Sequence, residues 1–172
     1  TNMTLAIIIL SLIAFWISSQ LYHHYFHQRS PWLSSPQSVR QSLLNNLNLQ
    51  SGQIFAELGA GSGTLARQIA KRYPTNQIYA YEISYLPFLI GSLLAGRQPN
   101  LSFIRGDINK ADLQLVDTFF IYTNRESLQT IYTKLSKYHK NQLLYSYKHQ
   151  LTNQSAHQVL EAGKDSIYLY KL

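Results

Sequence analysis

The chain has 172 residues, and 15 Lys and Arg against 8 Asp and Glu give it a formal net charge of +7 at neutral pH. It has no cysteine, which excludes disulfides, thiol catalysis and cysteine-type zinc sites. The basic residues form no long run, so we expect no nucleic-acid partner and interpret the excess charge as helix faces exposed to water or anionic lipid.

The N-terminal segment differs in composition from the rest of the chain. Residues 1–28 contain no Asp, Glu, Lys or Arg, and the 19 residues from 3 to 21 are almost wholly apolar. A helix of that length crosses a hydrocarbon core about 30 Å thick. Trp16, Tyr22 and Tyr25 lie toward its C-terminal end, as in an interfacial aromatic belt. We predict a transmembrane anchor domain over residues 1–28, with a cleaved signal peptide as the alternative.

Basic residues after the apolar segment set its expected orientation. Arg29 and Arg40 follow it, whereas no basic side chain precedes it. The positive-inside tendency therefore favours a single-pass protein with residues 29–172 on the cytoplasmic side, or on the equivalent side of an organelle. Residues 23–27 hold three histidines but no carboxylate, so we expect them to lie at the membrane interface and predict no metal site.

A strand, a glycine turn and a helix follow one another in residues 53–72. Residues 53–56 predict a buried strand, and residues 64–72 predict a helix with apolar side chains at i, i+4 spacing. Between them lies Glu57-Leu58-Gly59-Ala60-Gly61-Ser62-Gly63. Glycines admit close approach of a ligand, and a helix N-terminus offers free N–H groups. The third glycine comes one residue too early for a dinucleotide fingerprint, and the carboxylate of Glu57 suits an ammonium group better than a pyrophosphate.

Two further predicted strands end on an acid. Residues 77–83 close on Glu82, which lies 21 residues beyond Gly61, and residues 101–107 close on Asp107. An acid about 20 residues after the glycines commonly binds a ribose diol. Each acid alone also suits a helix cap or a solvated loop. Together, however, three acids at the ends of successive strands indicate a ligand site at one edge of an open α/β sheet.

The second half of the chain completes an alternating pattern. Its predicted elements are a strand at 116–122, a helix at 126–138, a strand at 142–147 and a hairpin with strands at 157–161 and 167–170. We therefore predict the α/β class, with a Rossmann-like seven-stranded sheet and a C-terminal antiparallel hairpin, in one domain of residues 29–172.

These motifs resemble a known enzyme class. The acidic glycine turn resembles motif I of class I S-adenosylmethionine (SAM) methyltransferases, whose sheet has the same strand pattern. The segment Ser30-Pro31-Trp32-Leu33-Ser34-Ser35-Pro36-Gln37-Ser38-Val39 is similar to one preceding motif I in single-pass membrane protein-lysine methyltransferases, those acting on the adenine nucleotide translocase and the ATP synthase c-subunit, and in their prokaryotic relatives. Residues 123–126 lack a proline that this family often has, and residues 149–153 lack its Pro-Gly-Trp-like turn.

The resemblance implies SAM as the cofactor. It places Glu57 near the SAM amino group, Glu82 on the ribose hydroxyls, and Asp107 with the backbone after it at the adenine. The cofactor residues that it implies are Glu57, Gly59, Ala60, Gly61, Gly63, Glu82, Ile83, Asp107, Ile108, Tyr122 and Ser35.

The acceptor chemistry follows from the methyl donor. SAM carries its own activated methyl, so catalysis is mostly alignment of the acceptor. A lysine must first lose a proton from a group whose pKa is ordinarily near 10.4, and burial in an apolar slot lowers that pKa. We expect Tyr122 and Tyr147 to line the slot beside Trp32, with Asn124 as an orienting group. Ordinary strand aromatics are the alternative for both tyrosines.

Together these observations predict a membrane-anchored SAM-dependent N-methyltransferase. The expected partners are the lipid bilayer and a membrane-associated protein that supplies the acceptor lysine. Two alternatives stay open: a methyltransferase for a membrane-resident small molecule, such as a lipid headgroup or quinone precursor, and a SAM-fold module that binds without turnover.

Overall fold

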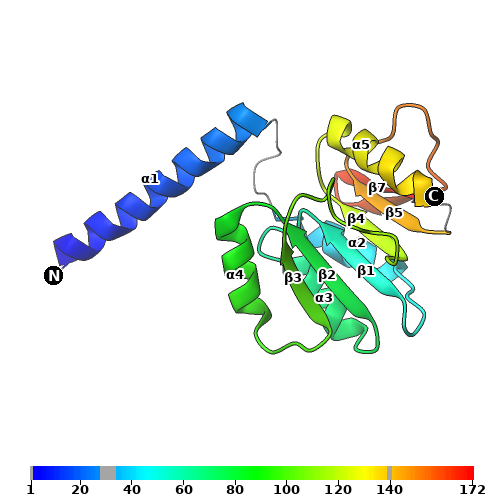
Figure 1. Cartoon of the computed structure of the whole chain (residues 1–172), viewed down its shortest axis with the longest axis horizontal. Coiled ribbons are helices and arrows are strands. Elements are labelled where there is room, and N and C mark those ends of the chain that lie inside the picture. The colour runs from blue at the N-terminus through cyan, green and yellow to red at the C-terminus, as the bar shows by residue number, and fades with distance from the viewer. Residues whose placement is uncertain (1, 28–33, 139–140) are drawn as a thin grey trace. The chain divides into compact units, whose positions relative to one another are not determined.

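The computed structural model describes residues 2–27, 34–138 and 141–172 of the chain. It contains two compact units, Thr1–Leu33 and Ser34–Leu172. The first unit holds α1 (Asn2–His27), and its stretch Met3–Gln20 is long and apolar enough to cross a membrane (Figure 1). A signal sequence near an N-terminus has the same length and composition. The predicted boundary between residues 28 and 29 lies outside the described residues.

The second unit is built on one seven-stranded sheet (Figure 1). Its strands are β1 (Ile54–Leu58), β2 (Gln77–Glu82), β3 (Leu101–Arg105), β4 (Thr118–Ile121), β5 (Leu143–Tyr147), β6 (Gln158–Ala162) and β7 (Asp165–Lys171). Their order is β3-β2-β1-β4-β5-β7-β6, with the first five parallel and β7 antiparallel to both its neighbours. The predicted seven-stranded sheet with a C-terminal antiparallel hairpin is confirmed.

Helices cover both faces of this sheet. They are α2 (Gln37–Asn46), α3 (Thr64–Arg72), α4 (Tyr85–Ala95) and α5 (Arg125–Leu135), and the 3-10 turn η1 (Ser136–Tyr138) follows α5. The helix α3 packs on β1, β2 and β3, α4 packs on β2 and β3, and α2 packs on β6 and β7. The predicted helix at 64–72 has the expected bounds, whereas the helix expected to reach residue 138 ends at Leu135 and continues as η1.

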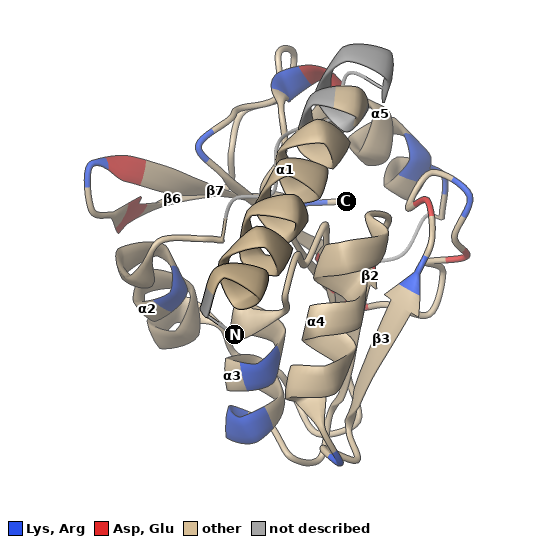
Figure 2. Ribbon diagram, turned by 90° about the vertical axis from the view of Figure 1, so that its left-hand side faces the viewer, with Lys and Arg blue, Asp and Glu red and all other residues tan. Residues whose placement is uncertain are grey.

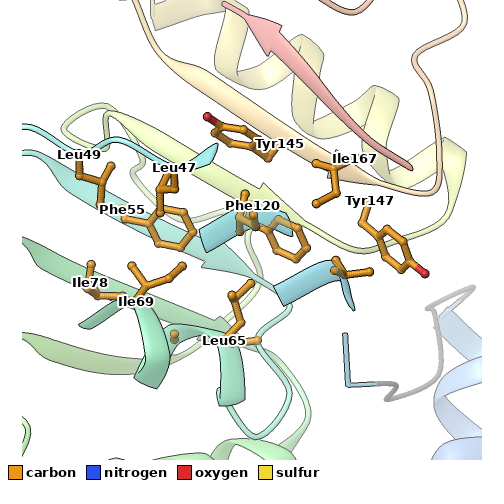
Figure 3. Packing of buried hydrophobic residues seen from close by; sticks show 14 of the residues in the cluster. Leu47, Leu49, Phe55, Leu65, Ile69, Ile78, Phe120, Tyr145, Tyr147 and Ile167 are labelled. Carbon is orange, nitrogen blue, oxygen red and sulfur yellow. The ribbon is translucent and has the colours of Figure 1, made fainter. Parts of the chain in front are cut away.

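Neighbouring side chains along the central strands enter opposite cores. On β1, Phe55 packs with α2 and α3, while the next residue, Ala56, packs with α5. On β4, Phe120 and Phe119 divide in the same way. Figure 3 shows the first cluster, in which Leu65 of α3 faces the sheet. Because both faces are buried, β4 reads as a continuous apolar run rather than an alternating one.

Most predicted strands differ from the observed ones by one or two residues at an end, and two of these differences have a clear local reason. The strand expected to start at Val116 starts at Thr118, because Asp117 instead pairs with Ile54 through both its backbone and its carboxylate. The last strand starts at Asp165 rather than Ile167, because Asp165 already pairs with Ala162 across the tight turn.

Candidate cofactor and acceptor site

The carboxyl ends of the parallel strands meet at one edge of the sheet. The strand order reverses between β1 and β4, since β2 and β3 lie on one side of β1 and β5 lies beyond β4. Ligands of open α/β sheets bind at such a switch point, outside the carboxyl ends of the strands. The glycine turn follows β1 at this edge, so the predicted ligand edge is the one that the topology provides.

The glycine turn is folded back on β2. The N–H groups of Gly59 and Ala60 both donate to the carbonyl oxygen of Tyr81, at 2.9 and 2.8 Å. Gly59 has φ +82°, and an added Cβ would meet no described atom within 4 Å, so the space beside it is open. At Gly63, with φ +68°, an added Cβ would lie 2.0 Å from Cζ of Phe103. Gly63 is therefore fixed by its left-handed backbone and by the ring against it.

Glu82 lies buried under this turn and is held by both of its oxygens. Oε2 accepts from the N–H of Gly61 at 2.8 Å, and Oε1 accepts from the N–H of Ser84 at 2.7 Å. Each carboxylate oxygen has two lone pairs, so each keeps one for a further donor. Two fixed acceptors beside a glycine turn fit the two hydroxyls of a ribose.

Glu57 has a structural partner that the sequence does not reveal. Its Oε2 accepts from the N–H of Ala66 at 2.9 Å, in the first turn of α3. The residue before that helix is Gly63, which has no side chain to cap it, so Glu57 takes this role from the adjacent strand. Burial raises the pKa of Glu57 to about 8, against the opposing effect of the Ala66 hydrogen bond and with a further rise from Glu82. Its contact with the SAM amino group stays a prediction.

Arg40 is a candidate site residue that sequence reasoning missed. Its Nη1 donates to the carbonyl oxygen of Ser35, and its charge acts to lower the pKa of Glu57. Its Nε is buried without a hydrogen-bond partner among the described residues. A buried donor without a partner makes Arg40 a candidate to bind the carboxylate of the SAM methionine end. Ser35 is thereby linked to this region through its backbone carbonyl.

Asp107 shapes a turn beside Glu82. The N–H of Gly106 donates to the carbonyl oxygen of Glu82 at 3.1 Å, which brings the end of β3 to the glycine turn. Oδ1 of Asp107 accepts from the N–H of Asn109 at 3.0 Å, and the carbonyl oxygen of Ile108 accepts from Lys134 Nζ at 2.8 Å. These bonds fix the loop. The adenine contacts expected of Asp107 and Ile108, and the cofactor contact of half-buried Ile83, stay predictions.

The two predicted acceptor tyrosines lie against one another. Their ring centroids are 4.6 Å apart at an interplanar angle of 61°, with Tyr122 just after β4 and Tyr147 at the end of β5. The hydroxyl of Tyr147 donates to Oδ2 of Asp165 at 3.0 Å, and burial together with this bond raises the pKa of Tyr147 to about 12. Tyr147 therefore stays neutral, and the pair offers its aromatic surface to an acceptor. Trp32, the third expected wall, lies outside the described residues.

Asn124 caps a helix. Its Oδ1 accepts from the N–H of Ser127 at 2.8 Å and so closes the first turn of α5. Asn124 comes two residues after Tyr122 in the chain and lies at the same edge of the sheet. Its side-chain oxygen is occupied by the hydrogen bond to the helix. Its predicted role in orienting the acceptor is not tested by this geometry.

His149 is a second residue that sequence reasoning missed. The preceding residue, Lys148, has the left-handed φ of +73°, and the Oγ of Ser146 donates to the His149 carbonyl oxygen at 2.8 Å. Burial lowers the pKa of the His149 imidazole, with further lowering by Lys148 and Arg125 and an opposing effect of Asp165. An imidazole whose pKa is lowered in this way can accept a proton at neutral pH. The sequence did not indicate this role, because His149 belongs to no motif of characteristic spacing.

Comparisons with known proteins agree with this geometry. Residues 27–150 match the family described as the O-methyltransferase domain. An 84-residue stretch is 29% identical to acetylserotonin O-methyltransferase of Rattus norvegicus, covering 46% of this chain and 19% of that protein. The chain thus spans about a fifth of the length of that relative.

Solved structures of methyltransferases share the fold. An RNA methyltransferase from Salinibacter ruber in complex with S-adenosyl-L-homocysteine superposes with TM-score 0.74 at 16% identity, over 81% of this chain and 93% of that one. A SAM-dependent methyltransferase from Aquifex aeolicus gives 0.62 at 15% identity, over 78% and 90%. The predicted methyltransferase fold and SAM as cofactor are confirmed. None of the relatives named here is a protein-lysine methyltransferase.

Proposed function

This chain belongs to the O-methyltransferase domain family and is a SAM-dependent methyltransferase, and we propose that its acceptor is a lysine amine of a membrane-associated protein. The observation that carries the proposal is the edge-to-face pair of Tyr122 and Tyr147 at the ends of β4 and β5. This pair stands across the topological switch point from Glu82, so an acceptor beside it approaches the methyl end of the cofactor.

The cofactor end of the site positions SAM through fixed groups. Glu82 presents two oriented acceptors to the ribose, and the open space beside Gly59 admits the ligand close to the backbone. Arg40 supplies a positive charge for the carboxylate of the methionine end, and buried Glu57, whose pKa is raised to about 8, offers a carboxyl oxygen that accepts a hydrogen bond from the ammonium. When bound, SAM supplies an activated methyl group on a sulfonium. The protein therefore contributes alignment rather than bond polarisation.

The acceptor end favours the neutral form of an amine. Tyr147 is almost fully buried, Tyr122 is half-buried, and the Tyr147 hydroxyl is occupied by Asp165. An amine entering this apolar, aromatic surrounding loses part of its hydration, which lowers its pKa and exposes the lone pair that attacks the methyl. No step of this account requires a dedicated base on the protein.

The apolar stretch Met3–Gln20 supports a membrane-associated acceptor. If it is retained as a transmembrane helix, it holds the catalytic unit near the bilayer and raises the effective concentration of acceptors there. The basic residues after it favour a catalytic unit on the cytoplasmic side or its organellar equivalent.

His149 favours a second candidate, the hydroxyl of a membrane-resident small molecule. A hydroxyl acceptor needs a base to take its proton, and the lowered pKa of His149 leaves the imidazole neutral for that purpose. The match to an O-methyltransferase domain and to a small-molecule O-methyltransferase supports this candidate.

One experiment separates the two candidates. Membranes are incubated with the full chain and methyl-labelled SAM, and the label is located by protein digestion with mass spectrometry and by lipid extraction. Under the lysine proposal the label is found on lysine, Tyr122→Ala lowers turnover far more than it weakens SAM binding, and His149→Ala changes little. Label confined to extracted lipid, with turnover lost in His149→Ala, would instead establish the hydroxyl acceptor. Tyr122→Phe serves as the matched control because it keeps the ring.

A further inference from the structure

We propose that α4 docks the methyltransferase unit on an anionic lipid surface through an exposed apolar face. The helix Tyr-Leu-Pro-Phe-Leu-Ile-Gly-Ser-Leu-Leu-Ala contains no charged residue. Tyr85, Leu89 and Leu93 recur at i, i+4 spacing and are 61%, 39% and 73% exposed, and Leu94 beside them is 58% exposed. This docking surface goes beyond the proposed acceptor and does not depend on it.

The distribution of side chains on α4 differs from that of an ordinary surface helix, which buries its large apolar residues. The buried positions of α4 are the small or short residues Pro87 and Gly91, which face the sheet. An added Cβ at Gly91 would lie 2.3 Å from Cε1 of Phe103 and 3.1 Å from the carbonyl oxygen of Ser62 in the glycine turn. The helix thus sits close against the cofactor turn through its small residues. The large apolar side chains of Tyr85, Leu89, Leu93 and Leu94 are exposed on the outer face, where a solvated helix carries polar ones, while Leu86, Phe88 and Ile90 are half-buried.

The charges around this face are positive. No Asp or Glu occurs between Glu82 and Asp107, whereas Arg97 and Arg105 flank the helix. The guanidinium of Arg105 lies 5.2 Å from the ring centroid of Tyr85, at the first turn of α4. Figure 2 shows α4 without charged residues between basic positions of the neighbouring α3 and the end of β3. An apolar helix face with a tyrosine and arginines at its border has the composition of an interfacial membrane helix.

The same charges decide between a bilayer and a second copy of this chain. A two-fold interface across α4 would bring each arginine of one copy toward those of the other without an acid in residues 83–106 to offset them. Anionic headgroups instead supply the missing negative charge and attract basic residues near the membrane surface. The observations therefore favour lipid as the occupant.

The covalent chain makes this docking feasible. Only 13 residues separate the apolar stretch ending at Gln20 from the catalytic unit beginning at Ser34. Even fully extended, they reach about 50 Å. A transmembrane helix would thus keep α4 within reach of the bilayer throughout, so a weak contact suffices to orient the unit.

The test uses the absence of native cysteines. Single cysteines are introduced in the full chain at Leu89→Cys and Leu93→Cys, with Thr133→Cys as the control on the exposed surface of α5. Each is labelled with an environment-sensitive fluorophore and reconstituted in nanodiscs of mixed phosphatidylserine and phosphatidylcholine. Quenching by lipid-borne nitroxide and by aqueous iodide is then measured. Far-ultraviolet circular dichroism and SAM titration confirm that each labelled protein is folded.

The proposal predicts that labels at 89 and 93 emit at shorter wavelength and lose fluorescence to the lipid nitroxide but not to iodide, while the label at 133 behaves oppositely. Pure phosphatidylcholine, or Arg97→Gln with Arg105→Gln, should reduce the lipid quenching. Labels quenched by iodide alone would overturn the proposal. Labels shielded from both quenchers would overturn it in favour of a protein partner, and equal lipid quenching with and without phosphatidylserine would overturn the anionic assignment.

Discussion

Glu57 is a buried acid whose environment opposes its charge. Burial, chiefly, raises its pKa from the ordinary value of 4.5 to about 8, although the N–H of Ala66 donates to it. The folded protein therefore holds this proton at pH values where the unfolded chain has released it. The stability that the neutral acid contributes is complete below about pH 4.5 and is lost as the pH rises through about 8.

This gives a stability prediction for the SAM-free protein. Glu57→Gln keeps an oxygen for the Ala66 N–H and removes the titration, so its unfolding midpoint should fall less between pH 5 and pH 8 than that of the unchanged protein. A shift from 4.5 to 8 corresponds to at most about 5 kcal/mol. Thermal unfolding across this pH range measures the difference. Glu126→Gln, an exposed control, should leave the profile unchanged, and parallel profiles for all three proteins would contradict the assignment.

Site residues differ in how far sequence could identify them. Glu82 was identifiable because its distance from Gly61 along the chain reflects a fixed strand–turn–helix–strand geometry, and the structure joins the two by a hydrogen bond. The capping role of Glu57 could not be identified from sequence, because it depends on the N–H of Ala66 pointing at the end of β1. Arg40 and His149 were missed because their importance arises from neighbours distant in sequence, which no local spacing encodes.

At the scale of elements, Asn124 fixes the start of α5. Its Oδ1 accepts the N–H of Ser127, and replacing an N-cap of this kind by alanine costs about 1 kcal/mol. We expect Asn124→Ala to lower the free energy of unfolding by that amount in urea denaturation, and Asn124→Asp to retain it. If Asn124 also orients the acceptor, Asn124→Asp lowers kcat at unchanged stability. Unchanged stability in Asn124→Ala would contradict the capping role.

The elements that sequence predicted share a clear periodicity. In the strands and in α3, apolar residues recur at the spacing that the element requires. The sequence therefore predicted β1, β2 and α3 nearly at their observed bounds. Two helices gave no such pattern. The helix α2 buries only Val39 and Leu43 in a polar sequence, and α4 is apolar all round with Pro87 in its first turn, where a proline is tolerated. Because the exposed face of α4 is apolar as well, its sequence has no amphipathic pattern from which a helix could be predicted.

At the scale of the whole molecule, the catalytic unit contains its own core. Among the described residues, both buried clusters consist of residues from Val39 onward, so the unit Ser34–Leu172 has a core of its own. We expect a chain beginning at residue 29 to fold and to bind SAM with unchanged affinity. Its methylation of membranes should fall through lost effective concentration. Circular dichroism, calorimetric SAM titration and a transfer assay at equal dilute concentration measure these outcomes, and full activity on membranes would contradict the anchoring role.

We infer that the glycine turn and the buried acid Glu82 beneath it hold SAM. Both oxygens of Glu82 are fixed by backbone N–H groups of Gly61 and Ser84, with lone pairs left for the ribose. Removing this carboxylate leaves the ribose hydroxyls without partners, which costs about 1–3 kcal/mol. Calorimetric titration of SAM into Glu82→Ala should therefore show affinity weakened by roughly 5- to 150-fold, while the exposed control Glu126→Ala binds normally. Unchanged affinity in a folded Glu82→Ala protein would show that this carboxylate does not bind the ribose.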